Sequence, residues 1–265
     1  MNPTVGHVLG TPLMLTDYDQ LAAQCREWAR SGQPVALEFA NTHIVTMRRH
    51  DPPFKVVTDS YDYFLPDGMP LIWVLNFKGA GLRDRVYGPT FMKKFLAEQK
   101  GGLTHYLLGG SEECGRRLKE IFGKLNPEAK FVGSNHGRCG ADGILAGAAE
   151  GEVIEEINRV SPDFIWVGLG TPKQQAWIHQ HKAQLKRGVL LGVGFAFDAN
   201  AGTKPDAPLW MQRWGLTWVH RLASEPRRLG PRYFKYNFLY LFYLLRDGLF
   251  GGPSGRGPAT PIPAK

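Results

Sequence analysis

The chain has 265 residues, of which 43% are hydrophobic and 21% are charged, a composition typical of a globular protein with ample length for a packed core. Its formal net charge of +8 favours an anionic partner without naming one. The three cysteines, Cys25, Cys114 and Cys139, are far apart, so the sequence predicts neither a disulfide framework nor a zinc site and favours a reducing cytoplasm.

Secretory and membrane-spanning segments are not expected. The N-terminus lacks the basic region and the long apolar core of a signal peptide. A spanning helix needs roughly 18 to 20 apolar residues, and the best candidate, 238–245, is far shorter. The sequence therefore predicts a protein that can lie on a membrane without crossing it.

Short apolar runs alternate with amphipathic stretches along most of the chain. The apolar runs predict strands over 34–39, 61–65, 104–108, 130–132, 163–167 and 188–193. The stretches between them predict helices over 41–50, 70–77, 90–100, 150–159 and 173–185, with another that follows Ser111 and ends at Leu125. The run Asp51-Pro52-Pro53 is predicted to end the first helix. The alternation predicts a Rossmann-like α/β core with a mostly parallel sheet.

The composition changes towards the C-terminus and predicts three parts: an α/β core over 1–203, a basic aromatic helical appendage over 204–247, and a disordered Gly- and Pro-rich tail over 248–265. The appendage contains many aromatic residues and a cluster of arginines: Arg213, Arg221, Arg227, Arg228 and Arg232. Such a segment suits an anionic membrane surface, a groove that holds nucleic acid, or a lipid tail that carries a diphosphate.

Candidate ligand sites lie where predicted strands end, because ligands of parallel sheets bind beyond the carboxyl ends of the strands. Gly168 and Gly170 would let backbone N–H groups approach a phosphate, and Lys173 and Gln174 would lie in the first turn of the following helix. The spacing is neither G-x-G-x-x-G nor a Walker A loop, so a ligand loop and a plain turn are equally compatible with it.

Other polar positions at strand ends have two interpretations each. The run Gly109-Gly110-Ser111 is a weaker signal of the same kind and favours a structural turn. Asp198 could accept a hydrogen bond from a sugar hydroxyl or could cap a turn. Asp67 lies in a Pro-Asp-Gly turn signal, yet a carboxylate at the mouth of a sheet could also act as a general base. The histidines show no ligand spacing, and no metal site is predicted.

Seven ordered motifs together carry a resemblance to a known family. They are PDGMPLIW (66–73), DRVYGPTF (84–91), YLLGG (106–110), VGLGTPKQQAWI (167–178), GVGFAFDANAGT (192–203), APLWMQRWGLTW (207–218) and RLASEPRRL (221–229). Over about residues 7 to 245, the chain resembles the WecG/TagA/CpsF family of glycosyltransferases.

The resemblance implies an activity, a location and partners. It implies an inverting, metal-independent transfer of a sugar from a UDP-sugar to a sugar on undecaprenyl diphosphate, in exopolysaccharide or other cell-surface polymer synthesis. It implies a cytoplasmic enzyme that is peripheral on the inner face of the cell membrane and has a helical appendage that meets that membrane. No cofactor and no nucleic acid are expected, and a homo-oligomer is left open.

The resemblance also implies roles for individual residues. Asp67 matches the candidate base, Gln174 and Asp198 match donor contacts, and Asn41 matches a pocket residue. Arg221, Arg227 and Arg228 match arginines that would meet a diphosphate. Two positions depart from the family: Phe39 stands where a Thr is common, and Thr217 stands where a Glu is usual.

Two other classes of function are alternatives to a glycosyltransferase. A nucleotide-dependent Rossmann-type oxidoreductase would need G-x-G-x-x-G after an early strand and an acidic residue about 20 positions later, and the sequence has neither. A non-catalytic basic module that binds membrane or nucleic acid would neither hydrolyse a UDP-sugar nor transfer its sugar.

Overall fold

The computed structural model describes residues 3–136, 138–139, 145–146, 150–250 and 260–261. Its centre is a sheet of six parallel strands in the order β4-β3-β10-β9-β5-β6. These strands are β3 (Pro34–Ala40), β4 (Tyr63–Pro66), β5 (Thr104–Gly109), β6 (Lys130–Asn135), β9 (Phe164–Gly168) and β10 (Gly188–Gly192). The predicted α/β fold with a parallel sheet is confirmed.

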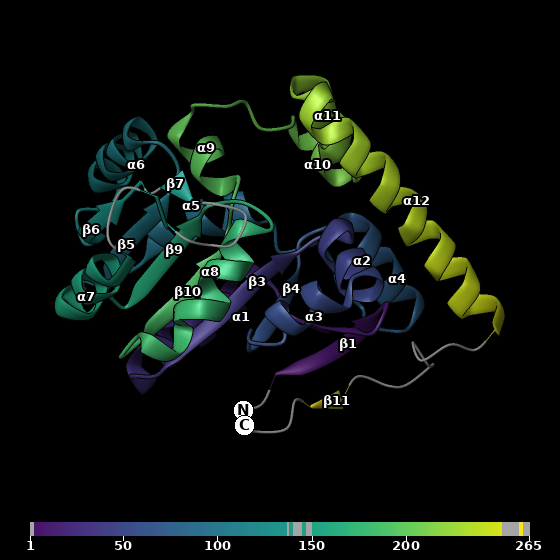
Figure 1. The fold of residues 1–265 in the computed structure, drawn as a ribbon, viewed down its shortest axis with the longest axis horizontal. Helices are drawn as coiled ribbons and strands as arrows, with labels where there is room; N and C mark the ends of the chain where they lie inside the picture. Colours follow the sequence, from purple (N-terminus) through teal and green to yellow (C-terminus); the bar gives the residue numbers. More distant parts are fainter. Residues whose placement is uncertain (1–2, 137, 140–144, 147–149, 251–259, 262–265) are drawn as a thin grey trace.

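Helices cover both faces of the sheet and enclose two apolar clusters (Figure 1). One face is covered by α2 (Thr42–His50), α3 (Pro52–Thr58), α7 (Glu150–Val160) and α8 (Lys173–His181), which a short 3-10 helix over Lys182–Gln184 follows. The other is covered by α1 (Tyr18–Ser31), α5 (Gly88–Glu98), α6 (Glu112–Leu125) and α9 (Ala196–Ala201). Side chains of β3 alternate accordingly, since Ala36 and Ala40 join the first cluster and Leu37 and Phe39 join the second.

Two antiparallel ribbons accompany the sheet. β1 (Thr4–Val8) pairs with β2 (Thr11–Met14) and with β11 (Thr260–Pro261). β7 (Arg138–Cys139) pairs with β8 (Leu145–Ala146). The strand β11 lies within the tail that was predicted to be disordered, and most of the tail lies outside the described residues, so the prediction for the tail stays a prediction.

The proline pair after α2 was predicted to end a helix, and it also begins one. Asp51 caps α3 by accepting a hydrogen bond from the backbone N–H of Phe54 at 3.2 Å. Pro52 and Pro53 occupy the first positions of α3, where proline loses no helical hydrogen bond and its fixed φ suits the helix. The chain therefore turns at Asp51 and continues as a second helix.

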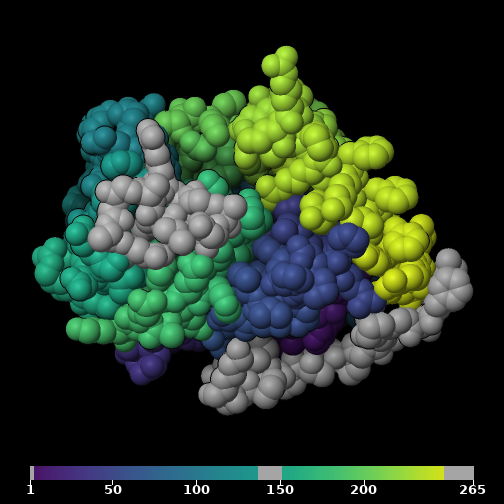
Figure 2. Space-filling view, viewed as in Figure 1, coloured from purple at the N-terminus to yellow at the C-terminus, as the bar shows by residue number. Residues whose placement is uncertain are grey.

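The C-terminal segment forms α10 (Leu209–Arg213), α11 (Thr217–Ser224) and α12 (Pro226–Phe250). The long helix α12 lies across the side of the core that carries α2 and α4 (Met69–Phe77), as Figure 1 and the yellow surface of Figure 2 show. Tyr240 anchors it, because its ring is buried and its hydroxyl donates to the Pro70 carbonyl oxygen at 3.1 Å. Among the described helices, none combines the length and the apolar character needed to cross a bilayer.

Candidate functional site

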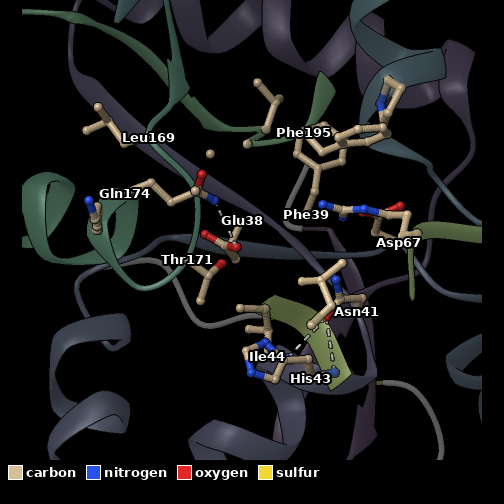
Figure 3. A pocket seen from close by; sticks show the side chains of 18 of the residues that line it. Glu38, Phe39, Asn41, His43, Ile44, Asp67, Leu169, Thr171, Gln174 and Phe195 are labelled. Atoms are coloured by element: carbon tan, nitrogen blue, oxygen red, sulfur yellow. Dashed lines mark hydrogen bonds between the residues drawn. The ribbon is translucent and has the colours of Figure 1, made fainter. Parts of the chain in front are cut away.

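A pocket of about 300 Å³ opens at the carboxyl ends of β3, β4, β9 and β10, beside α11 and α12. The strand ends contribute Asn41, Asp67 and most of the segments 169–174 and 192–195, and the C-terminal helices contribute three arginines. Figure 3 shows Glu38, Asp67 and Gln174 around this space. The pocket therefore lies where ligands of parallel sheets bind.

Asp67 follows β4 and is held by the backbone of the neighbouring strand. Its N–H donates to the Ala40 carbonyl oxygen at 2.9 Å. Its Oδ1 is buried and has no hydrogen-bond partner among the described residues. An unpaired buried carboxylate oxygen is costly, and here it faces a pocket that a ligand could fill.

The environment of Asp67 changes its acidity. Burial raises the pKa of the Asp67 carboxyl from 3.8 to about 7, although Arg85 and Arg221 oppose this rise with their positive charges. A carboxyl that titrates near neutral pH can accept a proton from a substrate hydroxyl and remain a reasonably strong base. The alternative of a plain turn does not explain a buried, unpartnered oxygen.

The loop between β9 and α8 forms one wall of the pocket. Gly170 has a φ of +76°, a left-handed conformation that favours glycine, and it brings backbone close to the empty space. Lys173 and Gln174 begin α8 and line the pocket, as the sequence predicted. Gln174 is buried, and its Nε2 donates to Glu38 Oε1 at 3.4 Å.

Glu38 is a pocket residue that the sequence analysis did not single out. It lies in β3 with 1% of its surface exposed, on the same face as Ala36 and Ala40. Its Oε1 accepts from Gln175 Nε2 at 2.9 Å, while its Oε2 is buried without a hydrogen-bond partner among the described residues. The signal that could have found it is a single charged residue within an apolar run.

Burial also determines the protonation of Glu38. It raises the pKa of the Glu38 carboxyl from 4.5 to about 8, and the nearby Asp67 charge adds to this rise. Hydrogen bonds from Gln175 and Gln174, and the nearby Tyr61 hydroxyl, act in the opposite direction. Glu38 is therefore mostly a neutral acid at pH 7, whereas Asp67 is divided between its two forms.

Asn41 and His43 connect the end of β3 to the C-terminal helices. Asn41 caps α2, because its Oδ1 accepts from the N–H groups of His43 at 3.0 Å and Ile44 at 3.2 Å. Arg232 of α12 donates from Nε to His43 Nε2 at 2.8 Å and contacts the Thr171 carbonyl oxygen at 3.4 Å. Burial, together with the charge of Arg232, holds the pKa of His43 well below 6.5, so this ring is neutral and can accept.

The predicted arginine cluster is divided by the structure. Arg221, Arg228 and Arg232 line the pocket, and the Arg221 guanidinium lies 4.2 Å from the centre of the Phe195 ring. Arg213 and Arg227 are exposed and do not line it. The pocket therefore has cationic groups along the edge that the C-terminal helices form.

Four of the predicted donor-binding residues do not line the pocket. A side chain at Gly109 would lie 2.7 Å from the Gly168 backbone, and one at Gly168 would lie 2.6 Å from Phe197, so both glycines permit close packing. Gly110 has a similar position against Phe197. Asp198 accepts from Thr203 Oγ1 at 2.8 Å and pairs with Lys204 at 3.3 Å, an arrangement at the end of α9.

Arg85, another residue missed by the sequence analysis, joins the Asp67 loop to the C-terminal helices. It is buried and donates to the Asp67 carbonyl oxygen at 3.4 Å and to Thr217 Oγ1 at 3.1 Å. Thr217 thus contacts this guanidinium without neutralising it. Phe39 lines the pocket and packs on Phe91, with ring centres 5.6 Å apart.

The sequence matches the description "Glycosyl transferase WecG/TagA/CpsF family" over residues 6–253. The chain belongs to the WecG/TagA/CpsF family of glycosyltransferases. This glycosyltransferase shares 28% identity over 196 residues, 72% of each chain, with a protein of Bacillus subtilis (strain 168). It shares 29% identity over 198 residues, 71% of each chain, with one of Bacillus spizizenii. A third relative, from Staphylococcus aureus (strain MRSA252), is 26% identical over 194 residues, 72% of each chain.

All three relatives carry the name N-acetylglucosaminyldiphosphoundecaprenol N-acetyl-beta-D-mannosaminyltransferase. The matched region of this glycosyltransferase contains the whole pocket. Within the described part of the chain, no group of three or more His, Cys, Asp or Glu side chains is arranged to hold a metal ion.

Proposed function

We propose that this glycosyltransferase moves a sugar from a UDP-sugar to a sugar carried on undecaprenyl diphosphate, with inversion at the anomeric carbon and without a metal. The observation that carries the proposal is the Asp67 carboxyl, which is buried, has a pKa of about 7, and has one oxygen without a hydrogen-bond partner among the described residues, within the pocket that three arginines also line. The names of the relatives support an N-acetylmannosaminyl donor and an N-acetylglucosaminyl acceptor.

Asp67 has the role of general base in the proposed step. Its carboxylate takes the proton of the acceptor hydroxyl while the hydroxyl oxygen bonds to the anomeric carbon from the face opposite UDP. The bond between that carbon and the diphosphate oxygen breaks, and its electron pair leaves with UDP. One glycosidic bond forms and one glycosyl phosphate bond breaks, Asp67 gains the proton, and the configuration inverts.

The departing diphosphate needs positive charge, which this chain can supply from its own residues. Arg221, Arg228 and Arg232 approach from the C-terminal helices, and Lys173 approaches from the start of α8. One guanidinium group can donate hydrogen bonds to two phosphate oxygens at once, and a helix N-terminus adds a partial positive charge. These groups would stabilise the charge that develops on UDP as the bond breaks.

The C-terminal helices have a second feature, an exposed apolar face. On α12 the exposed residues are Phe234, Phe238, Leu241, Phe242 and Leu245, while Tyr240 is buried against the core. On α10, Trp210 and Trp214 are exposed on either side of the exposed Arg213. Aromatic groups beside cations fit an anionic lipid surface, where rings enter the headgroup region and cations meet phosphates.

The helix α4 extends this apolar face beyond the C-terminal segment. Trp73 is 53% exposed and Phe77 is 90% exposed, and they lie four positions apart on the same helix. A side chain at Gly215, just after α10, would lie 3.2 Å from the Trp73 ring, so the two helices lie side by side. We include Trp73 and Phe77 in the proposed membrane surface, at the inner face of the cell membrane.

The test is transfer in vitro. The purified chain is incubated with UDP-N-acetylmannosamine or UDP-N-acetylglucosamine and with N-acetylglucosaminyl-diphosphoundecaprenol in anionic vesicles, and both UDP and glycolipid are measured. UDP release together with a glycolipid heavier by one sugar is expected, and EDTA should leave the rate unchanged. Absence of both products with every UDP-sugar would contradict the proposal, and loss of activity in EDTA would contradict its metal-independent part.

A further inference from the structure

Glu38 lies where the β3 and α8 sides of the pocket meet, and its chemistry is unused in the mechanism above. β3 presents its side chain towards α8, where Gln174 and Gln175 both donate to Oε1. The neighbouring strand β10 presents Gly192, and a side chain there would lie 2.9 Å from Glu38 Oε2. The glycine therefore allows this oxygen to lie close to the β10 backbone.

From this geometry we propose that Glu38 is a positioning residue that binds an uncharged oxygen atom on the sugar of the donor through its free Oε2. The inference rests on the proposed function and names a contact within that same site. A buried polar atom without a partner in a pocket is best explained by a ligand atom that supplies the missing hydrogen bond.

The position of Glu38 favours the sugar over the diphosphate. Glu38 lies two residues before Ala40 on β3, and the Ala40 carbonyl oxygen accepts from the Asp67 N–H at 2.9 Å, so the two carboxyls belong to neighbouring strand ends. The sugar must lie at Asp67 for the anomeric carbon to react, so Glu38 borders the same part of the donor. The arginines, by contrast, line the edge formed by α11 and α12 and suit the diphosphate.

The surroundings of Glu38 keep it neutral and able to donate. Tyr61 faces it, and the Tyr61 hydroxyl also lies 3.5 Å from the Gln174 carbonyl oxygen. Arg48 of α2 is near enough for a charge on Glu38 to raise the Arg48 pKa, but the Arg48 guanidinium forms its ion pair with Asp59 at 2.9 Å. With Asp67 as the other acidic neighbour, the pKa of Glu38 remains at about 8. Below that pH, Glu38 carries a proton that it can donate to an oxygen that only accepts, such as the carbonyl oxygen of an acetamido group.

Glu38 reduces the stability of the fold. Its pKa is 4.5 when exposed and about 8 when folded, so folding takes up a proton between these values. The free energy of unfolding therefore falls as the pH rises from 4.5 to about 8. Replacing Glu38 by Gln removes this pH-dependent loss of stability and keeps an acceptor for Gln175. Glu38→Gln should therefore melt at a higher temperature than the wild type at pH 8.

The experiment compares wild type, Glu38→Gln and Glu38→Leu by their KM for UDP-N-acetylmannosamine on either side of the Glu38 pKa. For the wild type, KM should rise as the pH passes through about 8, because ionised Glu38 cannot donate. Glu38→Gln should keep the low KM without that rise, because its amide N–H₂ group donates at every pH. Glu38→Leu should raise KM about 3- to 10-fold at neutral pH, the loss of one hydrogen bond, with a smaller change in kcat.

Two controls separate the possible outcomes. Glu156→Gln removes a carboxylate that accepts from Tyr106 at 3.0 Å and does not line the pocket, so its KM profile should match the wild type. Calorimetry with UDP alone should give one affinity for all variants, since UDP lacks the sugar. Identical pH profiles for wild type and Glu38→Gln, or an equal loss of UDP affinity in Glu38→Leu, would overturn the assignment while leaving the proposed function intact. A wild type that neither binds nor turns over any UDP-sugar would overturn both.

Discussion

Two buried carboxyls with different partners share one pocket. Asp67 has a pKa of about 7 and is opposed by Arg85 and Arg221, whereas Glu38 has a pKa of about 8 and is surrounded by amides and a phenol. The surroundings differ more than the pKa values do: guanidinium groups act on Asp67 and favour its ionised form, which suits a base, whereas amide groups hold Glu38, which suits a hydrogen-bonding role. Because the two charges interact, a pH profile reports values that belong to the pair.

Replacing Asp67 by Asn keeps its shape and removes its basicity. We expect Asp67→Asn to lower kcat by about 10² to 10⁴-fold, the usual contribution of a general base, while the KM for the donor changes little. Steady-state kinetics with the lipid-linked acceptor would measure both constants. Near-normal turnover would exclude Asp67 as the base.

The pH dependence of kcat follows from the same carboxyl. The base must be ionised, so kcat should rise as the pH increases through about 7 and then level off. In Asp67→Asn the residual kcat should lose this rise. A wild-type kcat that stays constant between pH 5.5 and 8, about one unit or more on either side of the Asp67 pKa, would contradict the assignment.

Some residues of the site could be predicted from the sequence and others could not. Asp67 directly follows a strand, and Gln174 lies in the first turn of a helix that follows another strand. The turn and helix signals in the sequence therefore placed both residues at the edge of the sheet where the pocket lies. Glu38 was missed because it lies inside a strand, where alternation shows which side it faces but not that a pocket opens there. Gly168 was interpreted as phosphate-binding, although its neighbour Phe197, 29 residues away, requires a glycine for packing.

At the scale of elements, apolar runs were sufficient to find the six strands of the sheet but not all the helices. The helix α1 was not predicted, although Leu21, Cys25, Trp28 and Ala29 form one buried face between the cap Asp17 and the left-handed Gly32. The short helix α9 has no comparable periodicity, because its six residues are too few for a clear stripe. The order of the strands in the sheet could not be predicted from the sequence, because it depends on contacts between distant segments.

The attachment of α12 to the core predicts an effect on donor binding. Arg232 contacts both His43 and Thr171, so Arg232→Ala should remove a half-buried cation from the pocket wall. We expect about a tenfold loss of UDP affinity by calorimetry, the scale of one hydrogen bond to a charged group. Arg227→Ala is the matched control, because Arg227 is exposed and outside the pocket. Equal affinities of the two variants would place the diphosphate elsewhere.

At the scale of the whole molecule, the pocket opens beside the face that carries the exposed aromatic residues. The helices α11 and α12 contribute arginines to the pocket and present Trp218, Phe234 and Phe238 outwards. An acceptor whose sugar enters the pocket would thus have its lipid tail near an apolar surface. This arrangement gives one physical reason for the unusual composition of the C-terminal segment.

The membrane surface predicts how the chain binds vesicles. Arg213, Arg227 and Lys235 are exposed, and each basic residue contributes on the order of 1 kcal/mol at an anionic surface, less as salt increases. Cosedimentation with anionic vesicles should weaken with salt without vanishing, because the apolar burial remains. The double variant Phe234→Ser/Phe238→Ser should lose most of the salt-resistant part. Val56→Ser, which changes a residue that is 64% exposed on α3, should bind as the wild type does.

The anomeric configuration of the product tests the central claim most directly. Disaccharide released from the glycolipid made with α-linked UDP-N-acetylmannosamine would be analysed by NMR. A single displacement assisted by Asp67 predicts a β-linked sugar in the wild-type product and almost none formed by Asp67→Asn. An α-linked product would require a retaining reaction, and a β-linked product formed at the normal rate by Asp67→Asn would require another base; either result would contradict the account.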